Sequence, residues 1–244
     1  MRQHENDELT EETADRPREP VFNLAPAVVV IAAACVAIHV LSAHVLSMTA
    51  YVWLIENFAF IPVRYSGVFP FTWAWLVSPL SYSLLHGGYA HLIINMIWLA
   101  AFGSPLANRI GTARFLAFWA ATALGAVALH YVLHSGEVIP LVGASGAISG
   151  MMGAAARFAF RIDRRMEKPA FAGEVLPIPR VLSSRPAVTF LLVWFIINFA
   201  TGMGFDAPGV SAQIAWEAHI GGFLVGFLAI RLFDRGAAGP ARSA

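Results

Sequence analysis

Ser145 lies within the stretch VGASGAISG (residues 142–150), where a loop leads into an apolar segment. Serine is a favoured N-cap residue, so one interpretation is that Ser145 only begins a helix. The other is nucleophilic catalysis, because the first N–H groups of a helix lack partners and its positive end would stabilise an oxyanion. Gly143 and Gly146 would let a substrate backbone approach closely. The Gly-x-Ser-x-Gly elbow of soluble hydrolases is absent, since Ala147 stands at its last position.

A second cluster, AWEAHIGGFLVG (residues 215–226), contains Glu217 and His219. Small residues four apart let membrane helices approach closely, and both clusters contain such pairs: Gly146 with Gly150, and Gly222 with Gly226. If the two segments pack together, His219 could accept the proton of Ser145. Glu217 is about 200° from His219 around a helix and should face elsewhere, near the outer surface. Nothing supports Asp206 of the preceding loop as a third member, so we expect a Ser145–His219 dyad.

The stretch HGGYAHLIINM (residues 86–96) contains three more polar side chains. His91 and Asn95 are four apart, so on a helix they would share one face, whereas His86 is expected in the loop just before it. Such a pair can form a hydrogen bond between helices or belong to a catalytic site. A metal site is a third interpretation, but there is no nearby carboxylate and the two-histidine spacing of hydrolytic zinc helices is missing.

These clusters lie in a chain with the composition of a membrane protein. Of its 244 residues, 58% are hydrophobic and 13% are charged, whereas about 25% are charged in a typical soluble domain. No Asp, Glu, Lys or Arg occurs between Tyr65 and Asn108. The net charge of +1 argues against a nucleic-acid partner.

Hydropathy predicts an all-α polytopic membrane protein with six apolar segments: 22–47, 84–103, 112–133, 145–160, 187–203 and 213–233. Fifteen of the sixteen Lys and Arg residues fall on one side of these segments and only Arg64 falls on the other. The positive-inside rule therefore places both termini in the cytoplasm. The loop between the first two segments is rich in aromatic residues, and we expect it to lie in the outer membrane interface.

The domain organisation follows from these segments. Residues 1–20 contain seven acidic residues and three arginines and are expected to form a disordered cytoplasmic tail. Residues 21–235 form one six-span domain, and residues 236–244 form a short cytoplasmic tail. The first segment has no signal-peptide pattern before it and is expected to be retained. Cys35 is the only cysteine, so no disulfide can form within the chain.

Taken together, the motifs resemble those of the rhomboid intramembrane serine proteases. The resemblance rests on His86-x4-His91-x3-Asn95 in the second segment, Gly143-x-Ser145-Gly146 opening the fourth, and Ala218-His219-x-x-Gly222 in the sixth. It implies a six-helix bundle with Ser145 as nucleophile and His219 as general base and then general acid. It also implies that His91 and Asn95 join the Ser145 N–H in an oxyanion hole, and that His86 supports the mouth of the site.

Three features differ from patterns that are common in this family: no arginine follows Trp73 and Trp75 in the outer loop, Ala107 replaces a glutamate, and Ser149 replaces an aromatic that stacks on the catalytic histidine. Trp216, one turn before His219, could substitute for that aromatic. None of the three features removes a group that performs bond chemistry.

The resemblance therefore implies a serine endopeptidase that cuts transmembrane protein substrates near their outer end, within the lipid bilayer. No metal, cofactor or nucleic acid is implied, and the compact six-span form points to a bacterial inner membrane.

The alternative is a rhomboid-like pseudoprotease that binds membrane segments without cutting them. A solute transporter has weak support, because no inverted repeat is visible. His130 and His134 are four apart and could bind metal, but interfacial histidines are commoner, so they are assigned no chemistry.

Overall fold

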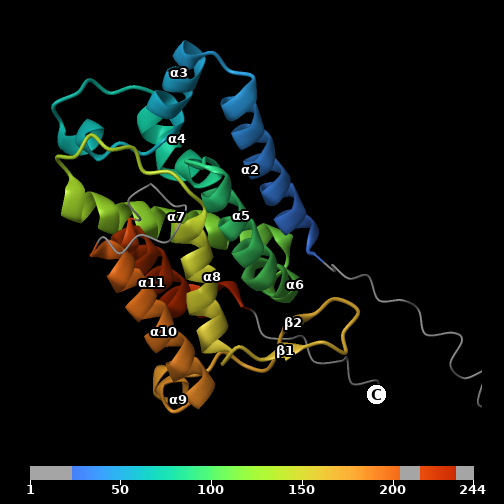
Figure 1. Ribbon diagram of the computed structural model, residues 1–244. Helices are drawn as coiled ribbons and strands as arrows, with labels where there is room; N and C mark the ends of the chain where they lie inside the picture. The colour runs from blue at the N-terminus through green and yellow to red at the C-terminus, as the bar shows by residue number, and fades with distance from the viewer. Residues whose placement is uncertain (1–23, 204–214, 235–244) are drawn as a thin grey trace, which may run out of the picture.

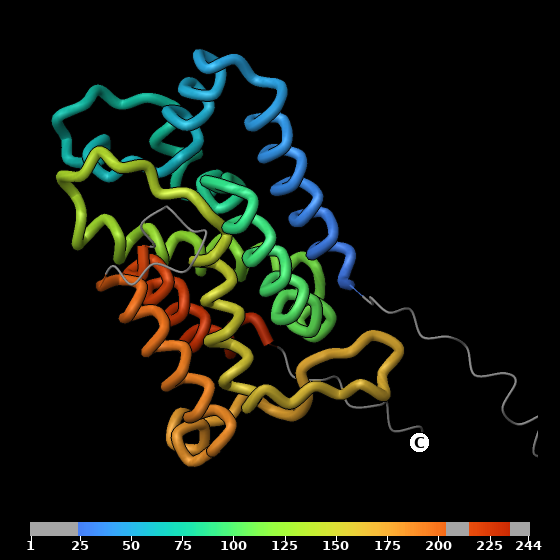
Figure 2. Tube along the Cα trace, viewed as in Figure 1, coloured from blue at the N-terminus to red at the C-terminus, as the bar shows by residue number. Residues whose placement is uncertain are grey.

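The computed structural model describes residues 24–203 and 215–234. The two expected tails (1–20 and 236–244) and Asp206 lie outside these residues. The fold is almost entirely helical (Figures 1 and 2), with these elements in chain order: α2 (Pro26–His44), α3 (Met48–Phe58), η1 (Pro62–Ser66), α4 (Ala74–Ser81), η2 (Tyr82–Leu84), α5 (Tyr89–Trp98), η3 (Leu99–Gly103), α6 (Ser104–Ile110), α7 (Thr112–His134), α8 (Ser145–Arg157), β1 (Ile162–Asp163), β2 (Ala170–Phe171), α9 (Ile178–Leu182), α10 (Arg185–Gly202) and α11 (Trp216–Phe233).

Five of the described helical segments are long and apolar enough to cross a membrane: α2, the continuous run from α5 to α6 (Tyr89–Ile110), α7, α10 and α11. They correspond to five of the six segments expected from hydropathy, and they confirm an all-α membrane bundle. The second segment is displaced toward the C-terminus, because the helix begins only at Tyr89 and continues to Ile110. Among the described residues, β-structure is limited to the two-residue ribbon of β1 and β2, apart from one isolated bridge.

The fourth expected segment is α8, which has 13 residues. Such a helix is about 20 Å long, shorter than the roughly 30 Å hydrocarbon core of a bilayer. Every residue of α8 from Gly146 to Arg157 is buried, and the helix lies in the middle of the bundle (Figure 1). Because α8 is surrounded by protein, its length need not match the thickness of the membrane.

Glycines bring α8 into close contact with two neighbouring helices. A Cβ atom on Gly222 of α11 would overlap the carbonyl oxygen of Gly146, and the same holds one turn further on for Gly226 and Gly150. The expected close approach of the fourth and sixth segments is therefore confirmed. A Cβ on Gly146 or Gly150 of α8, however, would point toward α7, and the one on Gly146 would lie 2.5 Å from Cβ of Ala126.

The aromatic outer loop is folded into α3, η1 and α4, which lie over the end of the bundle where α8 begins (Figure 1). Phe60 pairs through its backbone with Leu141, four residues before Ser145, with N···O distances of 3.1 and 2.8 Å. The Tyr65 hydroxyl lies 2.7 Å from Ser78 Oγ, and Tyr131 Oη donates to the Tyr65 carbonyl. These contacts attach the loop to α7 and to the segment before Ser145, although no arginine follows its tryptophans.

A buried ion pair closes the opposite end of the bundle. Arg109 Nε and Nη2 each lie 2.9 Å from a carboxylate oxygen of Asp234, and Nη1 donates to the Phe171 carbonyl. The pair connects α6, β2 and the end of α11. The carboxylate that holds Arg109 thus comes from a residue 125 positions away and not from position 107.

Candidate active site

Ser145 is the first residue of α8 and does not act as its N-cap. The N-cap position is Ala144, and no side-chain hydrogen bond caps the helix. The interpretation of Ser145 as a capping residue is therefore wrong for this structure. Its hydroxyl instead lies 2.8 Å from Nε2 of His219, and its backbone N–H is one of the donors that a helix start leaves without an intrahelical partner.

The imidazole of His219 is held on both sides. Nε2 faces Ser145 Oγ, and Nδ1 lies 2.6 Å from Oδ1 of Asn198 on α10. The amide orientation of Asn198 is defined by its Nδ2, which donates to the Trp194 carbonyl at 2.8 Å. Because Asn198 Oδ1 can only accept, Nδ1 of His219 must carry a proton. In the neutral imidazole Nε2 is then free to accept the proton of the serine hydroxyl.

The polar residues of the stretch HGGYAHLIINM (residues 86–96) lie next to this arrangement. Gly143 has a φ of +131°, and a Cβ there would lie 2.8 Å from Nε2 of His91 and 3.6 Å from Oγ of Ser145. The imidazole of His91 therefore occupies the space that a side chain at position 143 would fill. Asn95, one turn further along α5, is buried and donates from Nδ2 to the His91 carbonyl at 3.0 Å.

His86 precedes α5, as expected, with its ring centroid 5.2 Å from that of His91. It is buried, and neither ring nitrogen has a hydrogen-bond partner among the described residues. Its carbonyl lies 3.1 Å from Nδ1 of His39 on α2. The second, fourth and sixth segments thus bring four of the five expected site residues together at one end of the bundle, with Asn95 one turn below.

Comparison with known sequences assigns the chain to a family. A sequence model of the Rhomboid domain matches residues 72–235, well over half of the chain. The chain belongs to the rhomboid family. With its apolar helices, this rhomboid is an integral membrane protein.

Three named relatives are 27 to 29% identical to this rhomboid over the aligned residues. RHOMBOID-like protein 5 of Arabidopsis thaliana is 29% identical over 144 residues, which are 59% of this chain and 39% of that protein. Rhomboid protease GlpG of Enterobacter sp. (strain 638) is 27% identical over 146 residues, 60% of this chain and 44% of GlpG. YdcA of Bacillus subtilis (strain 168) is 28% identical over 167 residues, 67% of this chain and 70% of YdcA. This rhomboid therefore spans less than half the length of the first two relatives.

Asn198 is the site residue that sequence reasoning missed, since a dyad was expected. A signal was present, because an asparagine within the apolar run LLVWFIINFA needs a hydrogen-bond partner inside a membrane. The expected substitute for the missing aromatic, Trp216, does not fill that role here. Its indole lies against Gly202 of α10, where a Cβ would be 2.7 Å from Cγ of the ring. In this rhomboid Asn198 is the group that orients the histidine.

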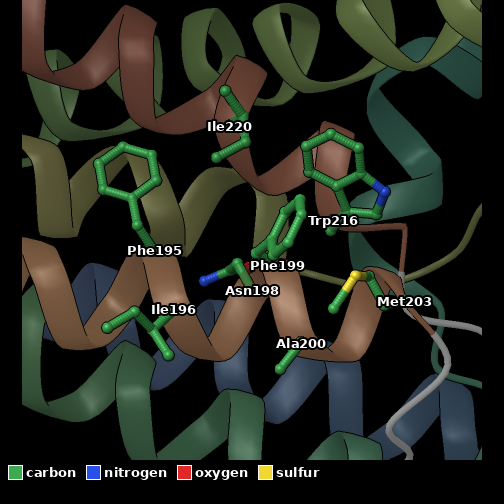
Figure 3. Close-up of a pocket in the computed structure, with 8 residues that line it drawn as sticks. All are labelled: Phe195, Ile196, Asn198, Phe199, Ala200, Met203, Trp216 and Ile220. Atoms are coloured by element: carbon green, nitrogen blue, oxygen red, sulfur yellow. The ribbon is translucent and has the colours of Figure 1, made fainter.

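A pocket of about 480 Å³ lies between α10 and α11 (Figure 3). Apart from the indole N–H of Trp216, Asn198 supplies the only polar side-chain group in its lining, which consists of Phe195, Ile196, Asn198, Phe199, Ala200, Met203, Trp216 and Ile220. The contact between Asn198 and His219 therefore lies at one edge of an apolar pocket that could receive an apolar side chain.

Proposed function

We propose that this rhomboid is an intramembrane serine endopeptidase in which Ser145 is the nucleophile and His219 the general base. The observation that carries the proposal is the 2.8 Å contact between Ser145 Oγ and His219 Nε2, with Asn198 holding the tautomer that leaves Nε2 able to accept a proton. A base beside a hydroxyl, itself oriented by a third group, is the arrangement that activates serine nucleophiles.

The reaction proceeds in two stages. Ser145 Oγ attacks the carbonyl carbon of the scissile peptide bond while its proton passes to His219 Nε2. His219 then protonates the leaving amine, the C–N bond breaks, and an acyl-enzyme remains. Water then attacks the ester while one of its protons passes to His219, and that proton returns to Ser145 as the acid product leaves.

The oxyanion of each tetrahedral intermediate would form beside the start of α8. We assign its stabilisation to the Ser145 N–H, to His91 and to Asn95. Each donor in such a hole contributes about 3 kcal/mol to transition-state stabilisation. His86 is assigned a supporting role, since its ring lies against that of His91.

Substrates are proposed to be transmembrane segments that enter from the side of α10. This helix is the least buried of the five candidate spans. In its apolar 18-residue stretch 11% is buried inside the protein, against 28 to 44% in the other four spans. Together with the pocket between α10 and α11, this supports a gate formed by α10. The substrate helix must unwind locally near its outer end so that a peptide bond can reach Ser145. We further propose a bacterial inner membrane, from the compact six-span form. The distribution of Lys and Arg supports an orientation with both termini in the cytoplasm.

Cleavage in liposomes tests the proposal. Wild-type protein reconstituted with a reporter whose transmembrane segment contains glycines near its outer end should release two fragments, which mass spectrometry would assign to one bond. Ser145→Ala should release none. A reporter that binds to the folded wild-type protein but stays uncut would instead support the pseudoprotease.

The contact of Asn198 with His219 gives a separate prediction. Asn198→Leu preserves volume but removes the acceptor for Nδ1–H, so we expect kcat to fall about 100-fold with little change in KM. This is a smaller loss than the roughly 10⁴-fold that follows when a serine protease histidine is held in the wrong tautomer. Asn198→Asp keeps an acceptor, though it loses the donor to Trp194, and should recover part of kcat. Wild-type kcat in Asn198→Leu would show that Asn198 does not position the histidine.

A further inference from the structure

Three metal-ligating side chains converge near the outer end of the bundle, outside the candidate active site. His130 and His134 lie in the last two turns of α7, and Glu217 lies in the first turn of α11. Glu217 Oε1 lies 2.7 Å from His130 Nδ1 and 3.3 Å from His134 Nε2. One ligand atom from each residue lies within 4.8 Å of the other two.

We propose that His130, His134 and Glu217 bind a divalent transition-metal ion, with zinc as the best match. Zinc binds imidazole nitrogens and carboxylate oxygens at about 2.0–2.2 Å in tetrahedral geometry, which places neighbouring ligand atoms roughly 3.3 Å apart. The distance from Glu217 Oε1 to His134 Nε2 already has this value. The distance from Glu217 Oε1 to His130 Nδ1 is 2.7 Å and must increase by about half an ångström. Two histidines four apart on a helix, joined by a carboxylate from a second helix, can surround one ion.

A fourth side chain supports a metal site independently. Nδ1 of His134, the nitrogen that does not face Glu217, lies 2.7 Å from Oε1 of Glu137. Metal-bound histidines commonly donate their other ring N–H to a carboxylate, which fixes the ring and raises its basicity as a ligand. Glu137 places His134 in this arrangement, with Nε2 directed toward the shared carboxylate of Glu217.

The chemistry of the donors favours zinc over other ions. Calcium and magnesium prefer sites made of oxygen ligands, while two imidazoles favour zinc, nickel or copper. Three protein ligands leave one position of a tetrahedral zinc ion for water. His134 is partly exposed, with 30% of its side chain accessible, so both the ion and that water could enter beside it.

A bound ion would connect α7 to α11 two residues before His219. It would hold the first turn of α11 and raise the stability of the folded protein, since the three ligands come together only in the fold. The sequence alone implied no metal in this protein and left both α7 histidines without chemistry. The proposal departs from that expectation because Glu217, 87 residues from His130, completes the cluster.

Zinc titration of the full-length protein tests the proposal without relying on proteolysis. The protein should be purified without a polyhistidine tag, stripped with a chelator and titrated with zinc against a chromophoric competitor. Wild type should bind one equivalent, and zinc at 100 times its dissociation constant should raise Tm by roughly 5 °C. Glu137→Gln should weaken zinc binding about tenfold, as expected for a carboxylate that hydrogen-bonds to a histidine ligand of the metal.

His134→Gln is the decisive variant. It removes one ligand but leaves the contact of His130 with Glu217 intact, so it should fold, keep its basal activity and weaken zinc binding more than 100-fold. His86→Ala serves as a control in the separate group of histidines formed by His86, His91 and His39. It should leave zinc affinity unchanged. Zinc affinity in His134→Gln equal to that of wild type, or no zinc binding by wild type, would overturn the proposal and leave an ordinary hydrogen bond between α7 and α11.

Discussion

His219→Gln should lower kcat for cleavage of a transmembrane reporter by about 10⁴- to 10⁶-fold, the range seen when serine proteases lose a member of the catalytic machinery. Glutamine can still hydrogen-bond to the Ser145 hydroxyl, but its amide cannot take up the proton when the bond to substrate forms. It also cannot protonate the leaving amine. The loss should therefore appear in kcat, with KM changed little, because the reporter still binds in the same place.

A matched histidine provides the control. His44 lies at the exposed end of α2, where its imidazole contacts the Tyr89 hydroxyl. His44→Gln should cleave within about twofold of wild type, because surface substitutions usually change little. If His219→Gln retained more than a hundredth of wild-type kcat while folded, His219 would not be the base, and the contact with Ser145 would be structural only.

Gly222→Val should abolish cleavage although it changes neither Ser145 nor His219. A Cβ at this position would overlap the carbonyl oxygen of Gly146, which is backbone and cannot rotate away. Overpacking a close helix contact costs about 1–3 kcal/mol, and more where backbone must shift. The two helices must separate to admit the side chain, and His219, one turn from Gly222, would move away from Ser145. Thermal unfolding and reporter cleavage should both report the loss.

Gly136→Val serves as the comparison, since nothing lies within 4 Å of a Cβ at this position in the loop after α7. It should retain wild-type Tm and cleavage. Full activity in Gly222→Val would contradict the close packing of α8 against α11 on which the site depends. A protein that keeps its Tm but loses cleavage would show that the spacing of the two helices matters to the chemistry directly.

Much of the fold could be predicted because each membrane span is a local property of the chain. Long apolar runs can be recognised without knowledge of their neighbours, so most of the helices begin and end within a few residues of the predicted segments. The second is the exception, since it was expected at 84–103 and spans Tyr89–Ile110. The glycine pairs also carried information about packing, since Gly222 and Gly226 do contact the α8 backbone. That contact is what brings His219 to Ser145.

Partners far apart in the sequence could not be predicted in the same way. Asn198 contacts His219 because one particular face of α10 lies against α11. The sequence of α10 is apolar nearly all round and contains few polar residues, so it gives little indication of which face that is. The pairing of Arg109 with Asp234 likewise depends on where two helices end in space. The N-cap interpretation of Ser145 could be rejected only once the helix start and the bond to His219 were visible.

Labelling with a fluorophosphonate probe tests most directly whether Ser145 is activated by His219. The wild-type protein in detergent should gain the mass of one adduct, mapped by peptide sequencing to Ser145. Ser145→Ala should gain none, and His219→Gln should react at least about 10³-fold more slowly, since the hydroxyl then has no base. A folded wild-type protein that does not react, or an adduct that persists in Ser145→Ala, would contradict the account.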